Sequence, residues 1–357
     1  MTNSSPSARK KILHIISGDL WAGAEAQAHT LLKNLKPLCD VSVVLLNDGE
    51  LARRLRACDI GVTIFDETKL STWNIFSLLR SHIQRLQPDA VHTHRQKENI
   101  LGAVANATTI RARCIRTAHG APEFTGNWKT NLQRQFDIWV GNHIQDSIIS
   151  VSDGLKTKLS EIYPQRKIHV VHNGVDADDL LRMAKVAEFR VKEPHKNHIG
   201  IIGRLVPVKR VDIFLNIAAL FKEEAATLYH FHIIGDGPLR HQLETQATDL
   251  KLGNLITFHG NRTDVPSCIK SLNAIVMCSD HEAMPMVALE ALALETPFLT
   301  HIPSLVSVLG LPISFLLEGH LEINSHFKQL IERLPHTVMP AILFDAKTNA
   351  LKTWELY

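Results

Sequence analysis

Cysteine is scarce in this chain, and none of it is arranged for disulfide or metal binding. The 357 residues include only five cysteines, with no C-x-x-C pair among them. Zinc ribbons and disulfide-stapled secreted folds depend on such pairs at regular spacings. The sequence therefore argues against both classes and favours a reducing compartment, the cytoplasm.

Long apolar runs and an excess of one charge are also missing. No run approaches the roughly 18 apolar residues of a membrane span, and the strand-like segment 12–16 is too short for a signal peptide. The 39 basic and 36 acidic residues give a net charge of +3. Such a balance does not suggest nucleic acid as a partner.

Several familiar ligand-binding motifs are absent. The loop 17–25 contains Gly18 and Gly23, but neither G-x-G-x-x-G nor the Gly-Lys-Ser/Thr of a P-loop. A dinucleotide or Mg-ATP site therefore has no support there. The 20 histidines include no H-E-x-x-H, and His92 and His94, on one face of a predicted strand, have no evident third ligand. We therefore predict no metal.

What the sequence does contain is an alternation of short apolar runs and amphipathic segments. Strands are predicted at 11–17, 41–46, 62–65, 90–94, 114–118, 147–152 and 168–172, with helices at 24–35, 51–57, 75–86, 98–108 and 128–143. After a charged linker at 184–197 the alternation restarts, with strands at 198–203, 229–234, 255–260, 273–278 and 296–301.

This rhythm predicts an α/β fold with parallel sheets, in two Rossmann-like domains facing each other across a cleft that would hold the ligand. We place the domains at 1–184 and 185–340, with a final helix within 341–357.

Two loops of the second half carry residues suited to phosphate. Gly203 opens a loop that contains Arg204 and Lys209, directly after a predicted strand. Two cations there could hold a diphosphate, Arg through its planar fork and Lys as a point charge. Gly235 and Gly237 follow the next strand, where the backbone can approach a ligand closely. For the two cations, the alternative is a pair of solvated basic side chains.

The segment 280–290 holds two carboxylates, Glu282 and Glu290, around an apolar run. We expect Glu282 in a strand-to-helix loop and Glu290 about one and a half turns into the helix, with Pro285 in its first turn. Backbone N–H groups at such a helix start favour anions, whereas carboxylates suit the hydroxyls of a ribose or a sugar. An ordinary turn with two solvated glutamates is the alternative.

Two further features of the first half leave alternatives open. His119 follows a predicted strand and precedes Gly120, so it is a candidate for contact with a reacting centre, although a lone histidine is more often structural. The helix expected at 128–143 carries an apolar stripe with Lys129 and Arg134 beside it. We expect the stripe to pack in the core, with a membrane surface as the alternative; it consists of Trp128, Leu132, Phe136, Trp139 and Val140.

Taken together and in this order, these pieces resemble glycosyltransferase family 4, also described as glycosyl transferases group 1, which are retaining enzymes of the GT-B fold. The matching segments are 23–25, 117–119, 151–152, 172–176, 203–209, 235–238 and 282–290. The resemblance covers residues 12 to about 300, which is most of the chain.

The resemblance implies transfer of a sugar from a nucleotide-diphosphate donor, with a UDP-sugar as the first choice, to an acceptor hydroxyl. The acceptor would be a glycan or lipid-linked compound of cell-envelope, exopolysaccharide or glycolipid synthesis. The first domain would bind the acceptor, the second would bind the nucleotide sugar, and the final helix would cross back to the first. The enzyme would be cytoplasmic, with possible peripheral contact at the inner face of the bacterial membrane.

The resemblance also implies roles for single residues of the second half. Arg204 and Lys209 would neutralise the diphosphate leaving group in place of a metal, and Glu290 would hold the ribose hydroxyls. Glu282 would position the transferred sugar with the backbone N–H groups of the segment that follows it. The donor site would further include Gly203, Gly235, Gly237, Ala283, Met284, Pro285 and Met286.

In the first half, the resemblance gives roles to a glycine and a histidine. Gly23 would let its loop reach the donor phosphates, and His119 would contact the donor sugar near its anomeric carbon. The sequence departs from the family at Glu295, where glycine is usual, and at 302–307, which replaces Gly-Gly-x-x-Glu. We expect Glu295 to be exposed or hydrogen-bonded. An epimerase of the same fold and an inactive scaffold protein are the rival hypotheses.

Overall fold

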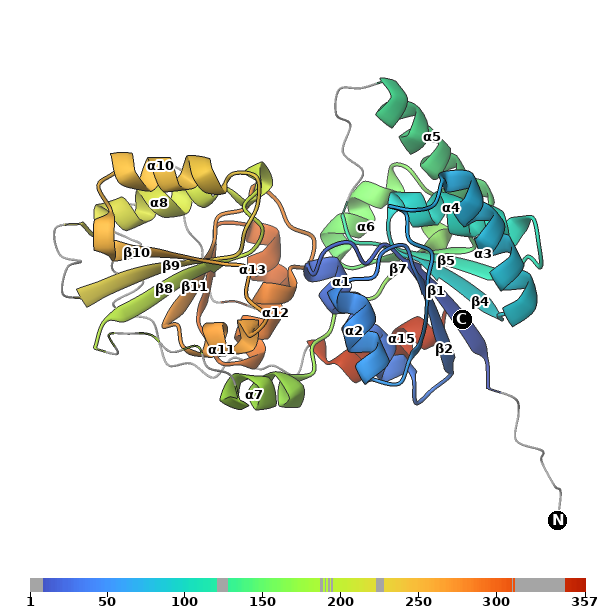
Figure 1. The fold of residues 1–357 in the computed structure, drawn as a ribbon, viewed down its shortest axis with the longest axis horizontal. Coiled ribbons are helices and arrows are strands. Elements are labelled where there is room, and N and C mark those ends of the chain that lie inside the picture. The colour runs from blue at the N-terminus through green and yellow to red at the C-terminus, as the bar shows by residue number, and fades with distance from the viewer. Residues whose placement is uncertain are drawn as a thin grey trace, which may run out of the picture. The chain divides into compact units, whose positions relative to one another are not determined.

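The computed structural model describes residues 9–120, 128–186, 189, 191, 193, 195–222, 228–309, 311 and 344–357. The chain divides into two units (Figure 1). Met1–Gly174 and Ala346–Tyr357 form the first unit, and Val175–Asp345 forms the second. The predicted linker at 184–197 does not mark the division.

The first unit contains a seven-stranded parallel sheet in the order β3-β2-β1-β4-β5-β6-β7. Its strands are β1 (Lys11–Ile16), β2 (Asp40–Leu45), β3 (Gly61–Ile64), β4 (Ala90–Thr93), β5 (Arg113–Ala118), β6 (Ser147–Ser150) and β7 (Ile168–Val170). The strand order reverses between β1 and β4, which makes the carboxyl ends of these two strands the switch point of this sheet.

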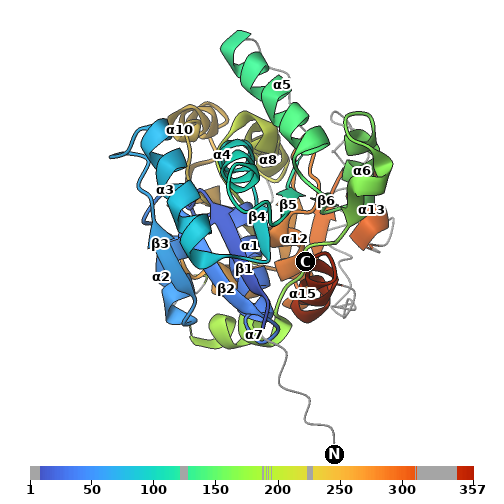
Figure 2. The same ribbon diagram turned by 90° about the vertical axis from the view of Figure 1, so that its right-hand side faces the viewer.

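Helices cover both faces of this sheet (Figures 1 and 2). The helices α1 (Gly23–Leu35), α2 (Glu50–Ala57) and α15 (Ala346–Trp354) lie on one face, and α3 (Thr72–Leu86), α4 (Gln96–Ala107) and α5 (Trp128–His143) lie on the other. A further helix, α6 (Asp153–Ser160), follows β6. The final helix packs against α1, which places the C-terminal segment in the first unit.

The apolar strands are buried on both faces because helices cover both. On β1, Leu13 and Ile15 pack with Leu79 of α3, whereas Ile12 packs with Leu31 of α1 on the opposite side. A parallel sheet covered in this way needs nearly continuous apolar strands. Full burial of each such side chain is worth about 1.5–3 kcal/mol.

The second unit contains a five-stranded parallel sheet in the order β10-β9-β8-β11-β12. Its strands are β8 (Asn197–Ile202), β9 (Tyr229–Ile234), β10 (Ile256–Gly260), β11 (Ala274–Met277) and β12 (Phe298–Thr300). Its helices are α7 (Ala177–Val186), α8 (Val211–Leu220), α10 (Arg240–Asp249), α11 (Val265–Lys270), α12 (Met286–Ala293) and α13 (Pro303–Leu309).

The observed division at Gly174 precedes the predicted boundary at 184 because α7 packs against α11 and α12 and so belongs to the second unit. In this sheet the strand order reverses between β8 and β11. The carboxyl ends of those strands are therefore the ligand-binding position expected of an open α/β sheet.

Candidate functional site

A pocket lies at the switch point of the second sheet. Its walls come from β8 and β11 and from the loops that follow these strands. Gly203, Arg204 and Lys209 line it from the first loop, and Ser279 and Val287 line it from the second loop and the start of α12. The structure thus brings the predicted cations to the place where the topology favours a ligand.

The three glycines predicted to approach a ligand have different structural roles. Gly203 adopts φ +154°, and the nearest atom to an added Cβ would be Cε of Lys209 at 3.7 Å. A Cβ on Gly235 would lie 1.9 Å from the carbonyl oxygen of Gly203, and one on Gly237 would lie 2.5 Å from that of Leu205. Only glycine fits at positions 235 and 237, because the backbone of a neighbouring loop occupies the space of a side chain. Packing within the protein therefore explains both glycines.

Lys209 and Glu282 form an ion pair between the two loops. Nζ of Lys209 lies 2.5 Å from Oε1 of Glu282, and both side chains are largely buried. Arg204, in contrast, is exposed, and within the described residues its guanidinium has no hydrogen bond or ion pair. The site therefore offers one cation that is already neutralised and one that is available to an anion.

A second link holds the same two loops together. Arg210 adopts φ +47° and donates from Nη1 to Oδ1 of Asp280 at 3.0 Å, while its other nitrogens bind Asp212. The backbone N–H of Asp280 donates to the carbonyl oxygen of Val208 at 2.9 Å. The run of basic residues after Val208 was the one signal in the sequence for these contacts between the loops, and they were not predicted.

Glu290 and the residues before it occupy the start of α12. Pro285 is the residue before the helix rather than part of its first turn, and the helix begins at Met286 with no side-chain cap. The first N–H groups of a helix have no intrahelical acceptor, so those of Met286 and Val287 are suited to an anion. Pro285 has no N–H and cannot contribute one. Glu290 is partly exposed on the following turn.

The remaining predicted site residues, Gly23 and His119, belong to the first unit. Gly23 is exposed and begins α1, whose start also lacks a side-chain cap. His119 directly follows β5 and is partly exposed. Burial, and after it the Arg95 guanidinium, lower the pKa of His119 to about 4. His119 is therefore neutral at physiological pH.

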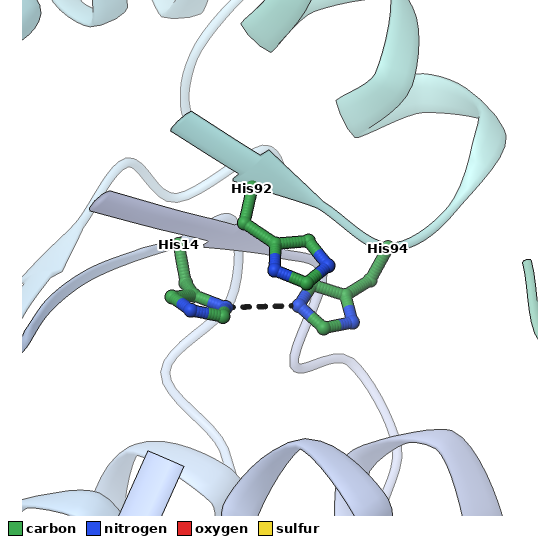
Figure 3. A group of neighbouring side chains, drawn as sticks. All are labelled: His14, His92 and His94. Atoms are coloured by element: carbon green, nitrogen blue, oxygen red, sulfur yellow. Dashed lines mark hydrogen bonds between the residues drawn. The ribbon is translucent and has the colours of Figure 1, made fainter. Parts of the chain in front are cut away.

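The switch point of the first sheet carries groups that the sequence analysis missed. Arg95 donates to Oε1 of the buried Glu25 at 2.5 Å and to Oδ1 of Asp19 at 3.0 Å. Glu98 is also buried, and burial raises its pKa to about 7. His14 on β1 lies beside His92 and His94, so the third histidine that the sequence did not reveal comes from a neighbouring strand (Figure 3).

The apolar stripe of α5 is mostly exposed. The exposed fractions are 70% for Trp128, 59% for Leu132, 43% for Phe136 and 48% for Trp139, whereas Val140 is buried. Figures 1 and 2 show the N-terminal turns of α5 extending beyond the neighbouring helices of the first unit. The expectation that the stripe packs in the core is therefore wrong, apart from Val140. No helix among the described residues has the length and apolar character to cross a membrane.

The departure at Glu295 has a backbone explanation. Glu295 adopts φ +56°, in the left-handed region, and its side chain is 54% exposed, 3.9 Å from Nζ of Lys270. The expectation of an exposed carboxylate is confirmed. Glycine suits this conformation better than any other residue, which accounts for the glycine that is usual there.

Comparison with known proteins agrees with these observations. The family model "Glycosyltransferase Family 4" matches residues 21–179, and "Glycosyl transferases group 1" matches residues 184–306. An α-1,4-N-acetyl-D-galactosaminyltransferase of Campylobacter jejuni, named for a GalNAc- and diNAcBac-containing diphosphoundecaprenol acceptor, is 32% identical over 290 residues. Those residues cover 80% of this chain and 77% of the relative. The chain belongs to the family 4, group 1 glycosyltransferases.

A second relative of this glycosyltransferase comes from Escherichia coli. It is named UDP-Gal:α-D-GlcNAc-diphosphoundecaprenol α-1,3-galactosyltransferase, and it is 25% identical over 309 residues, 82% of this chain and 79% of the relative. Among solved structures, Anabaena HepE in complex with UDP-glucose superposes with a TM-score of 0.80 at 20% identity. The superposition covers 97% of this chain and 98% of the HepE chain. The glycosyltransferase has the GT-B fold.

Proposed function

We propose that this glycosyltransferase transfers a sugar from a UDP-sugar, with retention of the anomeric configuration, to a hydroxyl of a lipid-diphosphate-linked glycan. The observation that carries the proposal is the pocket lined by Arg204 and Lys209, together with the ion pair between Lys209 and Glu282. The names of two relatives support it, since both act on diphosphoundecaprenol-linked acceptors and one takes UDP-Gal. The UDP-glucose bound in the HepE structure supports the choice of base.

In this proposal the second unit binds the donor. Arg204 and Lys209 bind the diphosphate and stabilise the charge that develops on the UDP leaving group, so that no divalent cation is required. The N–H groups of Met286 and Val287 add a positive helix end. Glu282 and Glu290 accept hydrogen bonds from hydroxyls of the sugar and the ribose. In the first unit, His119 contacts the donor sugar and the start of α1 at Gly23 contacts its phosphates.

The exposed stripe of α5 supports an acceptor held at a membrane surface. Trp128, Leu132 and Trp139 lie at helical spacing on the exposed side, and Lys129 and Arg134 belong to the same helix. Aromatic and aliphatic side chains insert at the headgroup boundary, and basic residues are attracted to anionic lipids. We propose peripheral contact of the first unit with the inner face of a bacterial membrane, where lipid-linked acceptors are available.

Thermal unfolding in the presence of UDP, GDP, ADP and their sugars, without added metal, tests the donor proposal. A ligand that binds only the folded state raises the melting temperature. We expect a shift with UDP and UDP-sugars that is lost in R204A/K209A, because each charge-assisted contact is worth about 1.5–3 kcal/mol.

The matched control is R182A/K185A, which removes the same charges from the exposed face of α7, outside the pocket. This control should keep the full shift. If none of the nucleotides raises the melting temperature, the proposal is contradicted and the scaffold hypothesis is favoured. Transfer of labelled sugar to a diphosphoundecaprenol-linked glycan, with release of UDP, distinguishes the transferase from the epimerase.

A further inference from the structure

A chain of hydrogen bonds, buried except at its His119 end, connects Tyr357 to His119 within the first unit. The Tyr357 hydroxyl lies 2.9 Å from Nε2 of His14 and 2.6 Å from Nδ1 of His92. Nδ1 of His14 lies 3.0 Å from Nε2 of His94, whose Nδ1 lies 3.4 Å from Nε2 of His119. These contacts join the segment after α15 to the candidate sugar-binding histidine.

The other branch of the chain ends at a threonine. Nε2 of His92 lies 2.8 Å from Oγ1 of Thr117 on β5. His14, His92 and His94 are fully or almost fully buried, and so are Tyr357 and Thr117. Every ring nitrogen of the three buried histidines thus has one partner, and each contact needs one proton. Because every ring nitrogen is engaged in a contact, the position of one proton determines the positions of all the others.

The groups in this chain are all neutral. Burial, and after it the neighbouring histidines, lower the pKa of His14, His92 and His94 well below the ordinary range. Burial also raises the pKa of the Tyr357 phenol well above its ordinary value, so that it keeps its proton. Each imidazole therefore carries one proton, and only two arrangements of the whole chain satisfy every contact.

The distances favour one arrangement. An O–H donor makes shorter hydrogen bonds than an N–H donor, by about 0.2 Å. The 2.6 Å contact therefore assigns the Tyr357 proton to Nδ1 of His92, and the 2.9 Å contact makes Nε2 of His14 a donor to the phenol oxygen. It follows that His92 donates to Thr117, that His94 donates to His14, and that Nε2–H of His119 donates to His94.

We propose that this chain fixes the tautomer of His119, with the proton on Nε2 and a lone pair on Nδ1, and that Tyr357 is a positioning residue for that histidine. Within the described residues, Nδ1 of His119 has no hydrogen bond. In this tautomer Nδ1 of His119 can accept a hydrogen bond from a hydroxyl group. The assignment of that hydroxyl to the donor sugar rests on the proposed function, whereas the tautomer does not.

A metal ion held by the three histidines is the rival explanation of the cluster. One nitrogen from each of His14, His92 and His94 lies within 4.8 Å of the others. The His92 and His94 rings, however, are stacked at 8° with centroids 4.6 Å apart (Figure 3). Imidazole lone pairs lie in the ring plane, so two parallel stacked rings do not converge on one ion. The hydrogen-bonded arrangement fits this geometry, and the metal does not.

Two conservative variants act on opposite ends of the chain and should have the same effect. In Tyr357→Phe, Nε2–H of His14 loses its acceptor, and an unsatisfied buried donor is costly. The proton moves to Nδ1, which forces His94 and then His119 into the other tautomer. In Thr117→Val, Nε2–H of His92 loses its acceptor, so the His92 proton moves to Nδ1, which donates to the Tyr357 oxygen. Tyr357 then donates to Nε2 of His14, and His14 and His94 change tautomer in turn. Both variants should move the His119 proton to Nδ1.

NMR of the full chain labelled with ¹⁵N-histidine reads these tautomers directly, with the His119 signals identified by their loss in His119→Gln. We expect a pyridine-type Nδ1 in the wild type and a pyridine-type Nε2 in both variants. The control is Tyr163→Phe, which removes another buried hydroxyl, bound to Arg116 at 3.1 Å, and should leave His119 unchanged. A wild-type proton on Nδ1, or variants that keep the wild-type tautomer, would overturn the proposal.

Zinc titration and kinetics complete the test. Stoichiometric Zn²⁺ binding that shifts the ¹⁵N signal of one ring nitrogen in each of the three histidines would overturn the hydrogen-bonded chain in favour of the metal. Tyr357→Phe and Thr117→Val should lower kcat/KM for the donor by about 2- to 10-fold, the value of one hydrogen bond. Reversed tautomers with unchanged kcat/KM would overturn the positioning role. If the wild type transfers no sugar, the proposed function fails while the tautomer result stands on the NMR signals.

Discussion

The 2.5 Å contact between Nζ of Lys209 and Oε1 of Glu282 joins the loop after β8 to the loop after β11. The carboxylate thus neutralises the lysine that we assign to the diphosphate. Glu282 is therefore both a candidate sugar ligand and a competitor for the cation of the phosphate site.

This pairing predicts opposite effects of Glu282→Gln on nucleotide binding and on transfer. UDP should bind more tightly, by about 3- to 10-fold, because Lys209 no longer shares its charge with a partly buried carboxylate. Sugar transfer should fall, because a contact to the sugar hydroxyls is weakened. Calorimetry with UDP and initial rates with the UDP-sugar measure the two effects. Weaker UDP binding would show that the pair orders the loop rather than competing with phosphate.

The exposed stripe on α5 predicts binding to anionic vesicles. Replacement of Trp128 and Trp139 by Ser should remove most of the binding to phosphatidylglycerol vesicles, because large apolar surface is lost from the interfacial face. Trp73 on α3 is 80% exposed and provides the control, since Trp73→Ser removes an indole that is more exposed than Trp128 or Trp139 from another helix. Co-sedimentation measures both. Equal loss of vesicle binding in the α5 variant and the Trp73 variant, or no loss in the α5 variant, would contradict the proposal that α5 contacts the membrane.

The buried histidines predict a loss of stability as the pH falls below their ordinary pKa of about 6.5. Burial lowers the pKa of His14, His92 and His94 in the folded state, that of His119 to about 4 and that of His232 to about 2. The unfolded chain therefore takes up protons that the folded chain refuses. Each histidine costs about 1.4 kcal/mol per pH unit once the pH is well below 6.5.

Glu98 opposes this trend, because burial raises its pKa to about 7 and the folded state then binds an extra proton between about pH 4.5 and 7. Burial also raises the pKa of Glu25 and Asp137, but these three carboxylates are outnumbered by the histidines, so the free energy of unfolding should fall from pH 7 to pH 5. Urea denaturation at each pH measures it, with the exposed His241→Gln as the control that retains the slope. A free energy of unfolding that does not change with pH would mean that the buried histidines are protonated in the folded state.

The left-handed backbone at Glu295 predicts that Glu295→Gly stabilises the second unit. A non-glycine residue pays about 1–2 kcal/mol in this conformation, and glycine loses about 0.5–1 kcal/mol more backbone entropy on folding. The net gain should be about 0.5–1 kcal/mol in the free energy of unfolding, measured by urea denaturation. Glu295→Ala keeps the strain while removing the carboxylate, and it should show no gain. A gain in the alanine variant would place the effect in the side chain.

The local pattern of the sequence predicted most of the secondary structure. The strands β1 to β5 and β8 to β11 begin or end within two residues of their predicted positions, since buried parallel strands have a distinct apolar signature. The helices α6, α7, α11 and α13 were missed, and none of them is longer than ten residues. The predicted linker at 184–197 overlaps the last turn of α7, and the helix packs against α11 and α12.

The candidate site was predicted only in part. Loops after adjacent strand ends could be identified from the strands that precede them, so Gly203, Arg204, Lys209 and Glu282 were found together. The packing role of Gly235 was not visible, because it depends on the carbonyl of Gly203 in another loop. The exposure of Trp128 was equally hidden, since helical spacing looks the same whether a stripe faces a core or a lipid.

The sequence by itself determined the α/β class, the family and the chemistry of the strand-end loops, because these follow from local periodicity and from residue types at short range. The tertiary structure decided which distant groups meet. Tyr357 and His14 are 343 positions apart, yet they share a hydrogen bond because α15 returns to the first sheet. His14 meets His92 because β1 pairs with β4 and not only with β2. Strand order and helix return are long-range choices, and no local pattern encodes them.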